Sequence, residues 1–435
     1  MESFNSNNNE NVLDERWFNS FKEFYFEDYE KLDGSKDKRA KAKESFLSGE
    51  IRNPVLDYPK LETFDLEGYE KGLLQLKSEL LEEEDNETIQ KIYRTKINEM
   101  VATVRMLKAC RDADDKKFSK YSEFIHGKPS VNNTAYAFDA VQHGFATSSP
   151  KTEQQESDQK KFLELIEGYE FGLVVGGEQA NRDDLPEVTD GSELVQNQEE
   201  AVQIIKEALS DLAVDDWTVV VNEKSGASNF SVAQEFKEVR VPSTDNLTKR
   251  KISKNDLAGL VAHEINTHVA RRVNGERSKL MLLGFGLDRY VKGEEGVATY
   301  QEQQVTGAKE FAGVPYYLAT AFAKGFDGTP RDFRDTFEVM KLYYSGKGMA
   351  DPDTTAWNTC VRIFRGTTGS TPGAVFTKDL AYLAGNREVW TLVNNDEDVV
   401  QQFSVGKYDP SREDHVAYLI QLGITEKDLD AVSEE

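Results

Sequence analysis

The stretch SKNDLAGLVAHEINTHVARRVNG, at residues 253–275, decides the fold around it, because it joins a helix signal to closely spaced metal-binding side chains. Ser253 and Asp256 have the spacing of an N-terminal capping box, in which each side chain bonds the other residue's backbone N–H. Apolar residues at helical spacing then lead into His263. We therefore predict a helix that begins after Ser253 and ends at the closing Asn-Gly pair, which is a common helix terminator.

The two histidines of HEINTH are separated by one residue more than in the HExxH motif of zinc peptidases. At about 100° per residue, five residues place His263 and His268 about 140° apart on a regular α-helix. Side chains that diverge so far cannot both make metal bonds of about 2.0 Å to one ion. A π-bulge adds one residue to a turn and restores a common face, so we predict a widened turn between Glu264 and His268.

Two imidazoles with a neighbouring carboxylate are typical of a zinc hydrolase. Glu264 is placed to act as the general base that deprotonates the attacking water, so it should not be a ligand. The third ligand must come from elsewhere, and we predict Glu295, at the start of the next helical stretch, GEEGVATYQEQQ. The flanking Gly293 and Gly296 would allow the close helix approach that a shared ion requires. Three protein ligands leave a fourth position open on a single Zn²⁺.

The composition indicates a globular protein that binds neither nucleic acids nor membranes. Hydrophobic residues make up 38% of the 435 positions, too many for a disordered chain. No apolar run approaches the roughly 20 residues that cross a bilayer, and the polar N-terminus does not resemble a secretory signal. The net charge of -25 repels polyanions. We expect a cytoplasmic protein without a disulfide framework, since its two cysteines, Cys110 and Cys360, lie far apart.

Shifts in composition and periodicity divide the chain into four parts. Helical periodicity is clear over residues 66–81 and 89–108. The polar segment that begins at Ser148 contains Pro150 and lacks periodicity. The predicted parts are a partly ordered arm (1–50), a helical region packed on the catalytic domain (51–147), a linker or long loop (148–160) and the metallopeptidase domain (161–435).

Two β-strands are predicted ahead of the helix that carries HEINTH, at residues 253–275, which we call the motif helix. After a helix at about residues 199–212, a β-branched run follows Trp217, and a second apolar run ends at Val241. Because Pro242 closes the second run, we expect that strand to lie at the edge of a sheet. An edge strand beside a peptidase site can pair with an extended peptide.

Several further motifs resemble those of a family of metallopeptidases that includes the microtubule-associated tyrosine carboxypeptidases and bacterial proteins with a QEGLA motif. The resemblance covers about residues 53–408 and implies zinc ligands at His263, His268 and Glu295 with Glu264 catalytic. This chain departs from the family pattern at Asn266, where glycine is usual, and at Val297, where leucine is usual. The motifs are NPVLDYP, YSEFIHGKPS, GASNFSV, HEINTHVARRVNG, EEGVATYQE and FRGTTGSTPGAVFTKDLAYLAG.

A carboxypeptidase needs a cation that binds the terminal carboxylate of its substrate, and arginine does so with two parallel hydrogen bonds. Arg365 and Lys378, within the last of these motifs, are candidates, with Arg271 and Arg240 as competitors. Tyr382 is a candidate donor to the oxyanion that develops on the attacked carbonyl. Salt bridges to neighbouring acids are the alternative role for each of these residues.

The sequence therefore predicts an α+β, helix-rich, gluzincin-like zinc metallopeptidase with a small sheet beside the motif helix. Its expected substrate is the C-terminus of a protein or peptide. Tubulin is not predicted, because its acidic surface would repel a chain of charge -25. Two alternatives remain open at this point: a regulatory protein that binds peptide tails without cleaving them, and a zinc amidase that acts on small molecules.

Overall fold

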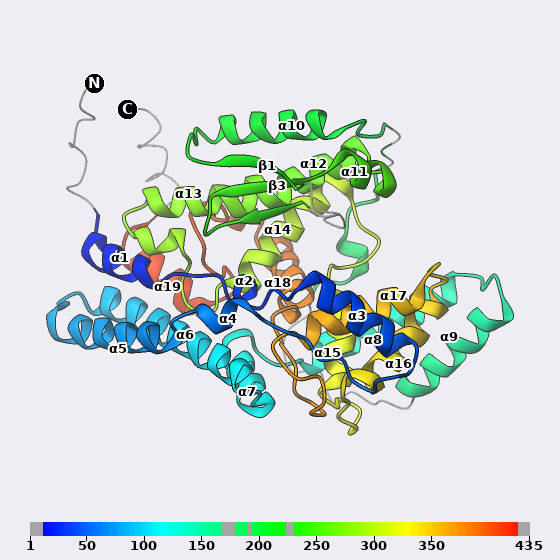
Figure 1. Ribbon diagram of the computed structural model, residues 1–435. Coiled ribbons are helices and arrows are strands. Elements are labelled where there is room, and N and C mark those ends of the chain that lie inside the picture. The colour runs from blue at the N-terminus through cyan, green and yellow to red at the C-terminus, as the bar shows by residue number, and fades with distance from the viewer. Residues whose placement is uncertain (1–11, 168–178, 190, 192, 223–229, 425–435) are drawn as a thin grey trace.

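The computed structural model is mostly helical and contains one small mixed sheet (Figure 1). It describes residues 12–424 except 168–178, 190, 192 and 223–229. The α+β, helix-rich architecture expected from the sequence is confirmed. Across the described ranges, no helix combines the length and the hydropathy that crossing a bilayer requires.

The N-terminal helices divide between two cores: the helices at residues 15–21, 66–83, 87–111 and 115–126 form one side of the molecule, whereas those at 36–47, 131–147 and 153–166 pack with the C-terminal helices (Figure 1). Trp17, Phe18 and Phe21 are buried in a core shared with the helices at residues 66–83, 87–111 and 413–421, so the aromatic residues of the arm hold its described part in place. The helices predicted over residues 66–81 and 89–108 are confirmed as α5 and α6. These elements are α1 (Glu15–Phe21), η2 (Lys22–Phe24), α2 (Asp28–Lys31), α3 (Lys36–Leu47), α4 (Lys60–Thr63), α5 (Leu66–Glu83), α6 (Glu87–Arg111), α7 (Asp115–His126), α8 (Val131–Thr147) and α9 (Glu153–Ile166).

The predicted linker at residues 148–160 is wrong, because α9 begins inside it. The side chain of Thr152 caps this helix by accepting a hydrogen bond from the backbone N–H of Gln155. Gln155 and Gln159 then donate side-chain hydrogen bonds to the carbonyl of Gly346. Tertiary hydrogen bonds satisfy these buried polar groups, so the helix packs without the apolar periodicity that would have revealed it.

The sheet has the order β1-β3-β2, with β3 parallel to β1 and antiparallel to β2. The prediction of an edge position for β3 is therefore wrong: it is the central strand, and Pro242 is its last residue, where a missing N–H costs little. The short β2 is an edge strand instead. These elements are η3 (Arg182–Asp184), α10 (Gln198–Asp211), β1 (Thr218–Asn222), β2 (Ser231–Ala233), β3 (Glu238–Pro242), α11 (Thr244–Arg250), α12 (Lys254–His263), η4 (Glu264–Val269) and α13 (Ala270–Arg277).

Helices cover one face of this sheet. Val239 and Val241 are fully buried against α10 and the motif helix, whereas the alternate residues Glu238 and Arg240 are only partly buried. The residues of the motif GASNFSV at positions 226–229 lie outside the described residues. The sheet therefore serves mainly as a platform on which the motif helix packs.

The motif helix begins as predicted but ends later. The capping box of Ser253 and Asp256 is confirmed by both of its hydrogen bonds. The predicted end at the Asn-Gly pair is wrong, because α13 continues to Arg277. Gly275 permits close packing instead, since a Cβ there would lie 2.3 Å from the backbone of Leu283 and Gly284.

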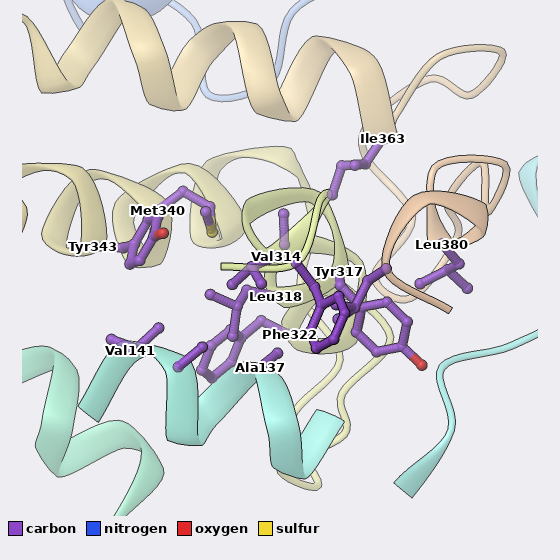
Figure 2. Close-up of a cluster of buried hydrophobic side chains, with 14 of the residues drawn as sticks. Ala137, Val141, Val314, Tyr317, Leu318, Phe322, Met340, Tyr343, Ile363 and Leu380 are labelled. Atoms are coloured by element: carbon purple, nitrogen blue, oxygen red, sulfur yellow. The ribbon is translucent and has the colours of Figure 1, made fainter. Parts of the chain in front are cut away.

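The C-terminal half surrounds α15, a helix that is apolar on all sides and therefore buried. Figure 2 shows Leu318 and Phe322 of α15 beside Ala137 and Val141 of α8, with Met340 of α16 nearby. The elements of this half are η5 (Met281–Gly284), α14 (Val291–Thr306), α15 (Val314–Ala323), α16 (Phe333–Gly346), α17 (Pro352–Ile363), α18 (Leu380–Asn395), η6 (Glu397–Gln402) and α19 (Glu413–Gln421).

Helix α14 lies in the centre of the molecule, between the motif helix and α18. A Cβ on Gly296 would lie 2.4 Å from the carbonyl oxygen of Gly385 in α18, and one on Gly293 would lie 2.4 Å from the Cα of Asp409. The predicted close approach at these glycines is therefore real, but its partners are α18 and the segment at Asp409 rather than the motif helix.

We expect the G296A variant to unfold with about 1–3 kcal/mol less free energy than the parent, because the new methyl group meets a backbone carbonyl that cannot move aside. Urea denaturation measures the difference. The control is G144A in α8, where a Cβ meets nothing within 4 Å. That variant should be stabilised by about 0.5–1 kcal/mol through helix propensity. Equal effects of the two substitutions would contradict the packing argument.

Candidate metal centre

A π-helical turn brings the two histidines of the motif onto one side of the helix. The turn spans Glu264–Val269, as the five-residue spacing predicted. The hydroxyl of Thr267 donates to the carbonyl of Ala262, at 2.9 Å, which satisfies one of the backbone groups that a widened turn leaves free. The ring centroids of His263 and His268 are 5.1 Å apart.

Glu295 completes a set of three donor atoms. Its Oε2 lies 3.9 Å from Nε2 of His263 and 4.0 Å from Nε2 of His268. Donors bonded at about 2.05 Å to one tetrahedral ion are about 3.4 Å apart, so a small inward movement would close this site on zinc. The same oxygen is buried and has no hydrogen-bond partner in the part of the chain that the structure describes. A cation is the partner that this donor set fits.

A carboxylate stands behind each histidine. Glu302 lies 2.9 Å from Nδ1 of His263, and Glu294 lies 2.9 Å from Nδ1 of His268. A carboxylate at Nδ1 keeps the proton on that nitrogen and leaves the Nε2 lone pair facing Glu295, which is how metal-binding histidines are usually oriented. All three carboxylates lie on α14, so this one helix both supplies a donor and orients the other two.

Glu294 is held by two buried cations. Arg271 donates to its Oε2 at 2.6 Å, and the amine of Lys407 lies 3.3 Å from its Oε1. Arg271 also donates to the carbonyls of Gly406 and Tyr408, at 2.8 and 2.7 Å. Burial opposes ionisation of Glu294, but these cations outweigh it and keep the pKa of the carboxyl well below its usual range. The segment around Lys407 is therefore part of the scaffold of the centre.

The charges at the centre shift the pKa of two further groups. Burial raises the pKa of Glu264, although His263 and His268 oppose the shift. Burial alone would lower the pKa of His263, but the hydrogen bond to Glu302 and the attraction of Glu264 and Glu295 raise it to about 9. Without a metal, the centre therefore binds protons strongly, as a cation-binding site should.

A cavity of about 560 Å³ opens onto these side chains. Ser231 and Val232 of the edge strand β2 line one part of it, and the amide of Gln234 donates to the carbonyl of His268. The cavity is therefore bounded by the motif helix and by a strand with a free edge among the described residues.

Three of the five residues predicted to bind substrate line this cavity. Arg365, Lys378 and Tyr382 do so, and the buried Nε of Arg365 has no hydrogen-bond partner among the described residues. Arg271 does not line the cavity, because it is 1% exposed and bound to Glu294. The amine of Lys378 is 2.8 Å from Asp28, so the cation pairs within the protein.

Arg240 also lies away from the cavity wall, on β3. It forms ion pairs with Glu30, at 3.3 Å, and Glu238, at 3.2 Å. This is the salt-bridge role that the sequence left as the alternative for each candidate cation.

Sequence reasoning did not identify several residues of the site. Glu302 follows Glu295 by seven residues, a spacing that puts both on one helix face, so its position could have been found. Two cations of the cavity, Arg362 and Lys407, lie far from the motif helix in sequence. Arg362 pairs with Asp379 and donates to the hydroxyl of Tyr382. Local sequence gave no signal for either cation, since only folding brings them to the cavity.

The sequence model of the family described as "Microtubule-associated tyrosine carboxypeptidase" matches residues 182–429, more than half of the chain. The chain belongs to this family. The matched range includes His263, Glu264, His268 and Glu295, whereas the motifs NPVLDYP and YSEFIHGKPS precede it. Microtubule-associated tyrosine carboxypeptidase 1 of Mus musculus is 30% identical to this family member over 138 residues. That match covers 30% of this chain and 26% of the mouse protein, so only about a quarter of the relative is represented.

We expect the R271M variant to lose about 3–5 kcal/mol of unfolding free energy, because Glu294 would lose its closest buried cation. Urea denaturation checks this value. R111Q is the control, since Arg111 pairs with Glu67 at a position where the side chains are 37% and 62% exposed. An exposed pair contributes at most about 1 kcal/mol. A similar small loss in both variants would show that Glu294 does not depend on Arg271.

Proposed function

We propose that this protein is a zinc-dependent carboxypeptidase that removes C-terminal residues from a protein or peptide. The observation that carries the proposal is the convergence of Nε2 of His263, Nε2 of His268 and the unpartnered Oε2 of Glu295. Two imidazoles and one carboxylate match the ligand set of catalytic zinc sites. Membership of a family described as carboxypeptidases supports the same reaction class.

Zinc, when bound by these three residues, would supply Lewis-acid chemistry that acidifies water and polarises a carbonyl group. Glu264 adjoins the first ligand and lines the cavity, so it can take the proton of the attacking water. Its raised pKa brings it closer to the range in which a carboxyl group both accepts and returns a proton near neutral pH. Glu264 then passes that proton to the departing amine, which completes hydrolysis of the peptide bond.

Arg365 is the best candidate for binding the terminal carboxylate of the substrate. Among the described cations that line the cavity, Arg362, Lys378 and Lys407 each have a carboxylate partner, whereas no ion pair involves Arg365. A guanidinium without a partner can give both of its parallel donors to a carboxylate. Tyr382 lines the same cavity and retains the proposed role of donor to the developing oxyanion.

The edge strand β2 offers a place for the substrate backbone. It pairs with β3 on one side only, and Ser231 and Val232 line the cavity. An extended peptide could add to the other side through backbone hydrogen bonds, the binding mode that the sequence suggested for β3. The predicted peptide-binding edge is therefore assigned to β2, whose residues line the cavity, instead of β3.

The names of the family and of the mouse relative refer to microtubules and to tyrosine, but we do not extend either to this chain. A net charge of -25 opposes approach to an acidic polymer. We propose a peptide or protein C-terminus as substrate, with no preference yet assigned to the residue that is removed.

The zinc-loaded parent should remove single C-terminal residues from a peptide library, with about one zinc per chain. The E264Q variant should keep its zinc and lose about 100- to 10,000-fold in rate, because only the general base is removed. Mass spectrometry of the peptide C-termini and metal analysis measure both. E82Q, an exposed substitution on α5, is the matched control.

Amidated versions of the same peptides should resist cleavage, because Arg365 would have no carboxylate to bind. Cleavage of amidated peptides would indicate an amidase instead. A zinc-loaded parent that cleaves nothing would indicate a protein that only binds peptide tails, and a parent without metal would contradict the site.

Zinc affinity should weaken as the pH falls. The pKa of His263 is about 9 without metal, so at neutral pH the ring carries a proton that zinc must displace. For each pH unit below that value, displacing this proton should lower the zinc affinity by up to about tenfold. The E302Q variant replaces the charged carboxylate that raises this pKa by a neutral amide, so its zinc affinity should fall less between pH 8 and pH 6. Titration with a competing chelator measures both slopes, and equal slopes would contradict the assignment.

A further inference from the structure

The N-terminal arm forms part of the wall of the catalytic cavity. Glu27, Tyr29 and Asp33 line the cavity together with the metal centre, although they precede the centre by more than 200 residues. They also lie outside residues 182–429, the range that the family model matches. The arm is therefore a part of this site that the family comparison does not assign.

A buried ion pair fixes the arm in this position. Asp28, 8% exposed, lies 2.8 Å from the amine of Lys378 and 3.5 Å from Nε2 of His126. The amine of Lys378 also lies 4.7 Å from the ring centroid of Tyr29. Because Asp28 and Tyr29 bind a cation of the cavity wall, the neighbouring Glu27 is held at the cavity too.

Glu27 differs from the other acids of the cavity in having no direct ion pair among the described residues, although the buried amines of Lys378 and Lys407 attract it at longer range. Asp379 pairs with Arg362 at 2.6 Å and Glu294 with Lys407 at 3.3 Å, while Glu264 and Glu295 face the metal centre. Glu27 accepts a hydrogen bond from the hydroxyl of Tyr25, and no described Lys, Arg or His forms an ion pair with it. Lys378 and Lys407 pair more closely with Asp28, at 2.8 Å, and with Glu294, at 3.3 Å, so the carboxylate of Glu27 is left to pair directly with a cation that enters the cavity.

We infer that Glu27 is a specificity-determining residue that binds a lysine or arginine side chain of the substrate, upstream of the bond that is cleaved. The inference rests on the proposed function. With the substrate carboxylate on Arg365 and a divalent ion between the histidines and Glu295, Glu27 remains the acid of the inner wall that has no direct ion pair among the described residues. Asp33 lies nearer the rim, 64% exposed and 4.0 Å from Lys60, and adds to the same negative field. The net charge of -25 also attracts basic peptides from a distance.

Peptide binding to the zinc-loaded E264Q variant tests this inference without requiring turnover. The peptides share one C-terminal residue and carry Lys, Gln or Glu at one of the three preceding positions, and fluorescence anisotropy gives their dissociation constants. At one of these positions, the peptide with Lys should bind about tenfold more tightly than the peptide with Glu. This ratio lies between the effects expected for an exposed ion pair and for a fully buried one. The additional substitution E27Q should bring that ratio near one, and E27K should reverse it.

E23Q is the matched control, because Glu23 is an exposed acid of the same arm that does not line the cavity. It should leave the ratio unchanged. A ratio that survives E27Q, a preference for Glu, or no binding of any peptide would overturn the inference. Turnover by the parent is measured separately: cleavage without a Lys preference refutes the role of Glu27 alone, whereas a Lys preference without cleavage refutes the proposed carboxypeptidase and leaves the role of Glu27 standing.

Discussion

The position of α14 is the constraint on which the rest of the site depends. This helix carries Glu294, Glu295 and Glu302, which together face both histidines of the motif helix. Its opposite side is fixed by direct backbone contact, since Gly296 lies against the carbonyl of Gly385 in α18. Three carboxylates can act on one pair of imidazoles only if the helix that bears them neither rotates nor moves away. The close packing at Gly296 provides that rigidity, because backbone atoms are in contact there. A side chain can change its rotamer to make room for a moving helix, but a backbone carbonyl cannot.

Two buried carboxylates at the centre, Glu294 and Glu295, differ in the number of cations that contact them. On one side, Glu294 is neutralised by Arg271 and Lys407, and these cations bind it to the segment that leads into the C-terminal helix. On the other side, Glu295 has an oxygen with no hydrogen-bond partner among the described residues. Buried charges are tolerated only when they are paired, so the first arrangement is a scaffold and the second is a place for a ligand cation. The same reasoning distinguishes Asp28, which forms a direct ion pair with Lys378, from Glu27, which forms no direct ion pair among the described residues.

Much of the motif helix could be predicted because its signals are local. The capping box, the five-residue spacing of the histidines and the widened turn all follow from helix geometry over a few residues. The errors arose where distant contacts decide the outcome. Gly275 reads as a helix stop, yet it serves the approach of Leu283. Residues 148–160 read as a linker, yet hydrogen bonds to Gly346 support a helix there.

The sequence by itself determined the helix-rich class, the motif helix with its π turn, and the residues that could bind a metal, because local spacing and side-chain chemistry are enough to predict each of these. Only the tertiary structure decided which cations reach the cavity, which strand is at the edge, and that the arm lines the site. The sequence offered both Arg271 and Arg365 as cations that could bind the substrate carboxylate. In the structure, Arg271 is enclosed by backbone carbonyls and Glu294, whereas Arg365 lines the cavity without an ion-pair partner among the described residues. The role of a charged side chain is set by its partners, and partners far apart in sequence meet only when the chain folds.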